Sequence, residues 1–326
     1  MGTLVGHVAP GFAFLVIGFW HLLNHIKLHV QNPKTYHSLP WFPSTKIRYI
    51  ELYCIMLGSS MSIAMELFIG PNRHQPFDTD GTIPSNHLHN FEHSFISMTF
   101  LVYAGFAILL DKFVPKARYE LTQLLAGIAF GQQLLLFHLH SADHMGVEGQ
   151  YHMLLQILIL ISFITTLMGI SYQKSFIVSF IRSISIFFQG LWLMVMGFML
   201  WTKSLIPKGC LLNLEEGHHV VRCHGEEALE RAKSLVNIQF SWYLIWVTIF
   251  VVSFYLAMYK IYEDKVEYQT ITRYDQELVH EDIEAQRKLE EYQNIVLKEK
   301  SFSPINMERQ KVLKGVISFT VGYFLL

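Results

Sequence analysis

The sequence predicts an all-α membrane protein: a bundle of seven transmembrane helices with its amino terminus outside the cell or in a lumen and its carboxyl terminus in the cytosol. Apolar residues make up 52% of the 326 residues and charged residues only 16%, and the mean hydropathy is +0.31. Soluble domains of average composition are more polar than this. Apolar runs of about 20 residues recur along the chain, each long enough to cross a bilayer.

Seven such runs predict the spans. Helices are required because lipid offers no water to unpaired backbone groups, and none of the runs alternates as a barrel strand would. The first run lacks a basic leader and a small-residue cleavage site, so it is predicted to be a mature helix and not a signal peptide. The predicted spans are Val5–Ile26, Ile47–Ile69, Leu88–Leu110, Leu121–Leu139, Tyr151–Ser171, Phe176–Trp201 and Leu235–Tyr259.

Short-loop charges predict the orientation. Basic residues concentrate in the loops after the first, third and fifth spans, whereas the loop after the second has only Arg73 and the loop after the fourth has none. Cytosolic loops carry the excess of Lys and Arg, so the amino terminus is predicted to lie outside. The basic residues are Lys27, Lys34, Lys46, Arg48, Lys112, Lys116, Arg118 and Lys174, with Arg182 just inside the sixth span.

Composition divides the chain into a transmembrane domain, residues 1–260, and a charged cytosolic tail, residues 261–326. The tail ends in an apolar stretch, Val312–Leu326, that is short for a crossing. This stretch either lies along the membrane surface or is a terminus without a function. The net charge of −1 gives no indication of nucleic-acid binding.

Two of the three cysteines, Cys210 and Cys223, share the loop between the sixth and seventh spans. The predicted orientation places this loop in an oxidising compartment, where a disulfide is expected. Two free thiols remain the alternative.

Histidines give the strongest functional signal. Twelve of the seventeen fall where one face of the membrane would gather them, and imidazole is the commonest metal ligand. Ionisable groups at membrane depth are costly, so they need a partner, an ion or a role. The twelve are His7, His74, His87, His89, His93, His138, His140, His144, His152, His218, His219 and His224.

Two pairs among them have the i, i+4 spacing that places side chains on one helical face: His89 with His93, and His140 with His144. Together with His152 and Glu66, they offer more ligands than one tetrahedral Zn²⁺ needs. Nitrogen and carboxylate ligands also suit Fe or Cu. The alternative is a set of histidines at the membrane interface that only form hydrogen bonds with water or pack against neighbouring side chains.

A general base is available beside these predicted ligands. The string from His89 to His93 matches the H-x-x-E-H pattern of some zinc proteases, a weak match in a histidine-rich chain. Glu92 or Asp143 would take a proton from metal-activated water.

A smaller polar group lies at the predicted inner end, where His21, His25 and His29 are spaced by four and Glu51 opens the second span. It is either a proton or metal relay or, the favoured interpretation, a stripe of cytosolic-interface residues.

Three short segments resemble the transmembrane protein 45 family, and in particular plant members described as viral-response proteins. They are the opening Gly6-His7-Val-Ala-Pro10-Gly11, the string Asn90-Phe-Glu-His93-Ser, and Leu136-Phe-His138-Leu-His140-Ser with Tyr151-His152 following. The resemblance covers roughly residues 1–260. It implies a multi-pass protein of an endomembrane or the plasma membrane and supplies no settled activity.

These features predict an integral membrane protein with a Zn²⁺ site at its outer or lumenal leaflet, acting as a metal-dependent hydrolase of a lipid or small amphiphile. A metal- or proton-handling protein without catalysis is one alternative, and a membrane scaffold or stress-response protein with structural histidines is another. Membrane lipids are the expected partners, and the oligomeric state is left open.

Overall fold

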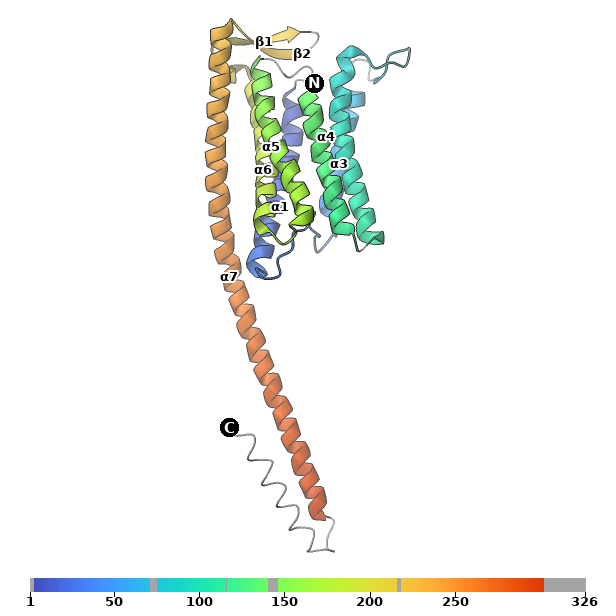
Figure 1. The fold of residues 1–326 in the computed structure, drawn as a ribbon, viewed down its shortest axis with the longest axis vertical. Coiled ribbons are helices and arrows are strands. Elements are labelled where there is room, and N and C mark those ends of the chain that lie inside the picture. The colour runs from blue at the N-terminus through green and yellow to red at the C-terminus, as the bar shows by residue number, and fades with distance from the viewer. Residues whose placement is uncertain (1–2, 71–74, 115, 140–145, 216–217, 302–326) are drawn as a thin grey trace. The chain divides into compact units, whose positions relative to one another are not determined.

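The computed structural model describes residues 3–70, 75–114, 116–139, 146–215 and 218–301 (Figure 1). The chain divides into two compact units, Met1–Glu263 and Asp264–Leu326, and the predicted apolar terminus lies outside the described residues. The elements in chain order are α1 (Leu4–Gln31), α2 (Ile50–Ala64) with a π-helical continuation (Met65–Ile69), a 3₁₀ turn (Ser85–His87), α3 (Leu88–Phe113), α4 (Arg118–Leu139), α5 (Gly146–Ser171), α6 (Phe176–Trp201), a second 3₁₀ turn (Lys203–Leu205), β1 (Cys210–Glu215), β2 (His218–Cys223) and α7 (Glu226–Ser301).

All seven predicted spans are helical, but within the described residues only six helices are long and apolar enough to cross a membrane. The exception is α4. Its sequence places Arg118 and Glu120 in the first turn and three glutamines further along, which lowers its apolarity below that of the others. The structure thus supports a mostly helical, membrane-type chain with six such helices.

Consecutive helices from α2 to α6 pack against one another, and α1 packs against α6, the helix furthest along this series (Figure 1). Glycines make this last contact close. A Cβ added at Gly190 would lie 2.6 Å from the carbonyl oxygen of Gly11, and one at Gly18 would collide with the backbone of Phe187. Helices in lipid associate through such small residues because side chains otherwise keep the backbones apart. We call this contact the α1–α6 seam.

The first part of α7 packs on the bundle through aromatic side chains. Phe250 stacks on Phe187 with 5.4 Å between ring centroids, and Phe240 contacts both Phe188 and Trp192 of α6. Aromatic pairs add to the stabilisation that comes from area burial alone. Trp192 is fully buried at the centre of this core.

The connection between α1 and α2, residues 32–49, folds across one end of the bundle, and we call it the strap. Its backbone bonds to groups from other elements: Ser38 N–H donates to Gln173 O at 2.7 Å, and the Tyr103 hydroxyl donates to Pro40 O at 3.2 Å. Trp41 and Phe42 of the strap are buried. The end of the bundle that the strap covers is called the strap end.

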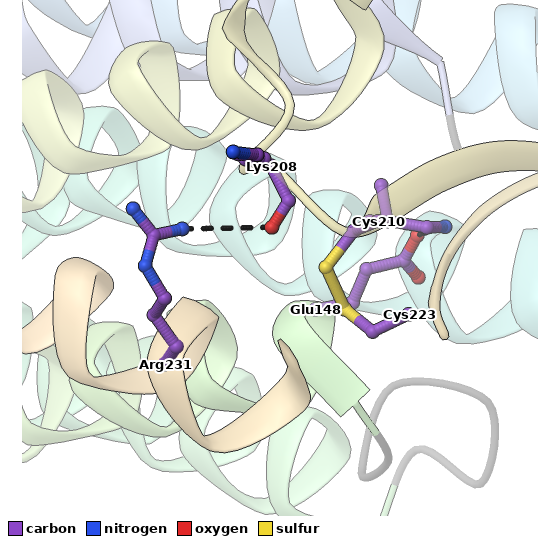
Figure 2. The surroundings of a disulfide bond; sticks show 6 residues. Glu148, Lys208, Cys210, Cys223 and Arg231 are labelled. Atoms are coloured by element: carbon purple, nitrogen blue, oxygen red, sulfur yellow. Dashed lines mark hydrogen bonds between the residues drawn. A yellow bond between two sulfur atoms is a disulfide. The ribbon is translucent and has the colours of Figure 1, made fainter. Parts of the chain in front are cut away.

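The opposite end of the bundle carries an antiparallel pair of strands, β1 and β2, that the sequence did not predict. The Cys210–Cys223 disulfide joins them (Figure 2), which confirms the predicted pairing. Glu148, in the first turn of α5, accepts a hydrogen bond from Val221 N at 3.1 Å and ties β2 to the bundle. Hydrogen bonds from Arg222 hold the pKa of Glu215 below its usual value. We call this the hairpin end.

We expect Cys210 and Cys223 of the native protein to resist alkylation until a reductant is added. The Cys210→Ser variant should lose about 2–4 kcal/mol of stability because the bond no longer restricts the unfolded chain. Peptide mapping by mass spectrometry after differential alkylation, together with thermal unfolding, measures both effects. Alkylation of both Cys210 and Cys223 in untreated native protein, beyond that of the free Cys54, would contradict the bond and the oxidising compartment inferred from it.

Candidate functional site

Glu66 is a buried carboxylate at the hairpin end. It lies in the π-helical turn that continues α2, and it is only 8% exposed. Asn90 of α3 donates from Nδ2 to Glu66 Oε2 at 2.8 Å and to the Glu66 carbonyl oxygen at 3.1 Å. The other carboxylate oxygen, Oε1, lies 3.4 Å from Nδ1 of His93. Single π turns inside helices are frequent at functional sites, so Glu66 and His93 form the nucleus of a candidate site.

His89 lies one turn before His93 on α3, as the i, i+4 spacing predicted, and the two ring centroids are 6.4 Å apart. Glu92, the predicted base, is half-buried on the same helix. The sequence therefore placed these three residues correctly relative to one another.

His152 of α5 is buried on the far side of an aromatic ring. Phe137 lies between the two histidines, with centroid distances of 6.3 Å to His93 and 5.8 Å to His152. Nδ1 of His152 donates to the carbonyl oxygen of Glu148 at 2.9 Å, so Nε2 is the unprotonated nitrogen of the neutral ring. His7, stacked on Trp201 at 4.5 Å, meets the edge of His152 at 5.9 Å.

The predicted metal set is only partly described. His140, Asp143 and His144 lie outside the described residues, as does His74. Among the residues that the structure does describe, no three His, Cys, Asp or Glu side chains are arranged to hold a metal ion. The described donors supply one carboxylate–imidazole pair, and the metal assignment remains a prediction.

A second polar cluster, at the strap end, centres on Glu51 of α2, which is 7% exposed. His21 Nε2 lies 2.7 Å from Oε1, and two obligate donors converge on Oε2: Trp20 Nε1 at 2.9 Å and the Phe42 backbone N–H at 2.8 Å. One carboxylate therefore joins α1, α2 and the strap.

Arg182 of α6 completes this cluster. Its NH2 group lies 3.2 Å from each of three acceptors: His25 Nε2, Ser38 Oγ and Leu39 O. A guanidinium only donates, so Nε2 of His25 must accept, and the proton of a neutral His25 sits on Nδ1. That nitrogen bonds to the Tyr36 hydroxyl at 2.9 Å. Arg182 thus keeps His25 in one tautomer.

The sequence favoured a stripe of cytosolic-interface residues for the inner histidines. The structure instead buries His21 and His25 in this network of hydrogen bonds. The sequence interpretation is closer for His29, which stacks on Phe176 at 4.0 Å and is only partly buried. In the sequence, Arg182 served only as one of the basic residues that predict the orientation. Its position inside an apolar span was the signal that could have identified it as a partner for buried groups.

Of the remaining histidines, His87 is buried in the 3₁₀ turn before α3, and His138 lies 3.3 Å from Gln156 Oε1. His218 and His219 lie in β2. A family comparison adds one finding. Residues 119–256, from α4 to the first part of α7, match the model of a family described as "Family of unknown function (DUF716)".

Proposed function

We propose that this chain is a multi-pass membrane protein of the transmembrane protein 45 type, in which α4 is a seventh span. The amino terminus would lie outside or in a lumen, and the tail in the cytosol, of an endomembrane or the plasma membrane. The support is the basic character of the strap end, with Lys34, Lys46 and Arg48, and the disulfide at the hairpin end. Basic loops favour the cytosol, and disulfides favour the opposite compartment.

We further propose that the hairpin end holds a Zn²⁺ ion, with Fe or Cu as alternatives, used in hydrolysis of a lipid or small amphiphile. The observation that carries this proposal is the buried Glu66 carboxylate, fixed by Asn90 on a π turn and directed at His93. Glu66 and His93 would bind the ion together with His89 and His152, and with His140 and His144 from the segment that the structure does not describe.

The chemistry that such an ion supplies is polarisation of water and of a carbonyl oxygen. The residues of this chain would contribute the rest. Asn90 orients Glu66, and the Glu148 carbonyl orients His152, as outer groups commonly do around metal ligands. Glu92 or Asp143 would accept the proton of the attacking water.

Metal content of the purified protein, measured by mass spectrometry, tests this proposal. We expect a near-stoichiometric metal in the wild type and its loss in His93→Ala and Glu66→Ala, with reduced stability because site binding couples to folding. His219→Ala, at an exposed position of β2, is the control and should keep the metal. Metal-free wild type with an unaffected His93→Ala variant would leave the histidines as a structural scaffold.

Replacement of the base separates an enzyme from a carrier. Glu92→Gln or Asp143→Asn should retain the metal and lower turnover of a lipid or ester substrate by about 10²–10⁴-fold. A metal-loaded protein with no turnover in any form, but with metal flux into sealed vesicles, would support the non-catalytic alternative.

A further inference from the structure

Arg182 carries a buried positive charge that no carboxylate of the described residues hydrogen-bonds. Its side chain is 3% exposed, and its hydrogen bonds go to an imidazole, a hydroxyl and a carbonyl oxygen. Glu51, the acid of the same cluster, uses both carboxylate oxygens on other donors. Burying a charge without a hydrogen-bonded counter-charge is expensive.

The other terminal nitrogen of this guanidinium, NH1, is buried and has no hydrogen-bond partner among the described residues. It points at Gly169 of α5, where an added Cβ would lie 3.0 Å from NH1 and 2.6 Å from Gln123 Nε2 of α4. The absence of a side chain at position 169 is therefore what lets these two polar groups approach the same spot.

Thr166 lies one turn before Gly169, on the same face of α5. Its hydroxyl is also buried and without a partner in the described part of the chain, and the residue is 1% exposed. Gln123 Nε2 donates to the Thr166 carbonyl oxygen at 2.9 Å, so Gln123 spans the space between Thr166 and Gly169. Between α4, α5 and α6, the available groups are mainly donors, beside a permanent positive charge.

We propose that Arg182, Gln123, Thr166 and Gly169 form a binding site for a small monovalent anion, of which chloride is the simplest example. An anion would accept from both N–H groups of NH1 and from the Thr166 hydroxyl, and would neutralise the guanidinium. Water could accept the same hydrogen bonds but would leave the charge unbalanced. The close packing of Gln123 Nε2 and Arg182 NH1 on Gly169 favours a small ion. This site is independent of the metal proposed at the hairpin end.

Thermal unfolding of the full chain in detergent or nanodiscs tests the proposal. Unfolding is monitored by tryptophan fluorescence, once in chloride and once in gluconate at equal ionic strength. Gluconate is too large for a site packed this closely. The wild type should therefore show a saturable rise in melting temperature with chloride, because a ligand of the folded state stabilises that state. Equal melting temperatures in the two salts would overturn the proposal and leave water as the occupant.

Matched variants locate the effect. Thr166→Val removes the hydroxyl at nearly constant volume. Gly169→Ala places a Cβ against Gln123 Nε2 and Arg182 NH1 and so displaces these donors. Both variants should lose the chloride dependence. Thr165→Val is the control, since the hydroxyl of Thr165 already donates to Ile161 O at 2.6 Å, and it should keep the dependence. If Thr166→Val and Gly169→Ala respond to chloride as the wild type does, any anion effect arises elsewhere and the site is refuted.

Discussion

Replacement of Gly190 by leucine is expected to prevent the bundle from assembling. A side chain at this position meets backbone on the α1 side of the seam, since its Cβ alone would lie 2.6 Å from the Gly11 carbonyl oxygen. Backbone cannot rotate away as a flexible side chain can. The two helices would have to separate. Overpacking a core typically costs about 1–3 kcal/mol, and this substitution should cost at least that much. Fluorescence-detected size exclusion in detergent should show aggregated or absent protein.

Gly58→Leu and Gly105→Leu are matched controls, because a Cβ at either position meets nothing within 4 Å. Both lie inside helices, α2 and α3, and should elute as the wild type does. Gly190→Ala should be intermediate. A Gly190→Leu protein that elutes and melts like Gly58→Leu would show that α1 and α6 do not approach this closely.

Removal of the Glu51 carboxylate is the second substitution with a large expected effect. Glu51→Ala leaves Trp20 Nε1, His21 Nε2 and the Phe42 N–H without their acceptor in a buried place. Removing one partner of a buried, charged hydrogen-bond network lowers the free energy of unfolding by about 3–5 kcal/mol. Since the strap is held partly through Phe42, its residues should become accessible to proteolysis. Glu51→Gln keeps one acceptor oxygen and should lose less.

Glu215→Ala is the comparison for Glu51. Its partner Arg222 is bound through two carboxylate oxygens, but both side chains are more than 40% exposed. Exposed ion pairs contribute at most about 1 kcal/mol. Thermal unfolding of the three variants measures the difference. Equal melting temperatures for Glu51→Ala and Glu215→Ala would mean that the Glu51 network does not hold the strap.

The apolar runs were sufficient to predict the helices, because span length and apolarity are local properties of the chain. The support is weakest for α4, whose glutamines are tolerated next to other helices but reduce its apolar character. Gln123, for example, bonds to α5. The pair β1 and β2 was missed, since two six-residue strands without a strong alternating pattern give little signal. The pairing of Cys210 with Cys223 was predictable only through the compartment that the loop charges indicated.

Part of the candidate sites was also predictable. Spacing along one helix correctly placed His89, Glu92 and His93 relative to each other, because an i, i+4 relation depends only on helix geometry. Partners from other helices could not be read in the same way. The contacts of Glu66 with Asn90 and of His25 with Arg182 depend on how helices pack, and Arg182 lies far along the chain from His25.

The α1–α6 seam also constrains the order of events during biosynthesis. α1 is synthesised before α6, the helix on which it mainly packs, so its glycine face lacks this partner while α2 to α5 are inserted. Until α6 is inserted, His25 lacks Arg182, the partner that later contacts its Nε2. Incompletely packed chains with exposed surface are the species that misassemble during synthesis. Nascent chains truncated before α6 are therefore the species on which membrane chaperones and quality control would act.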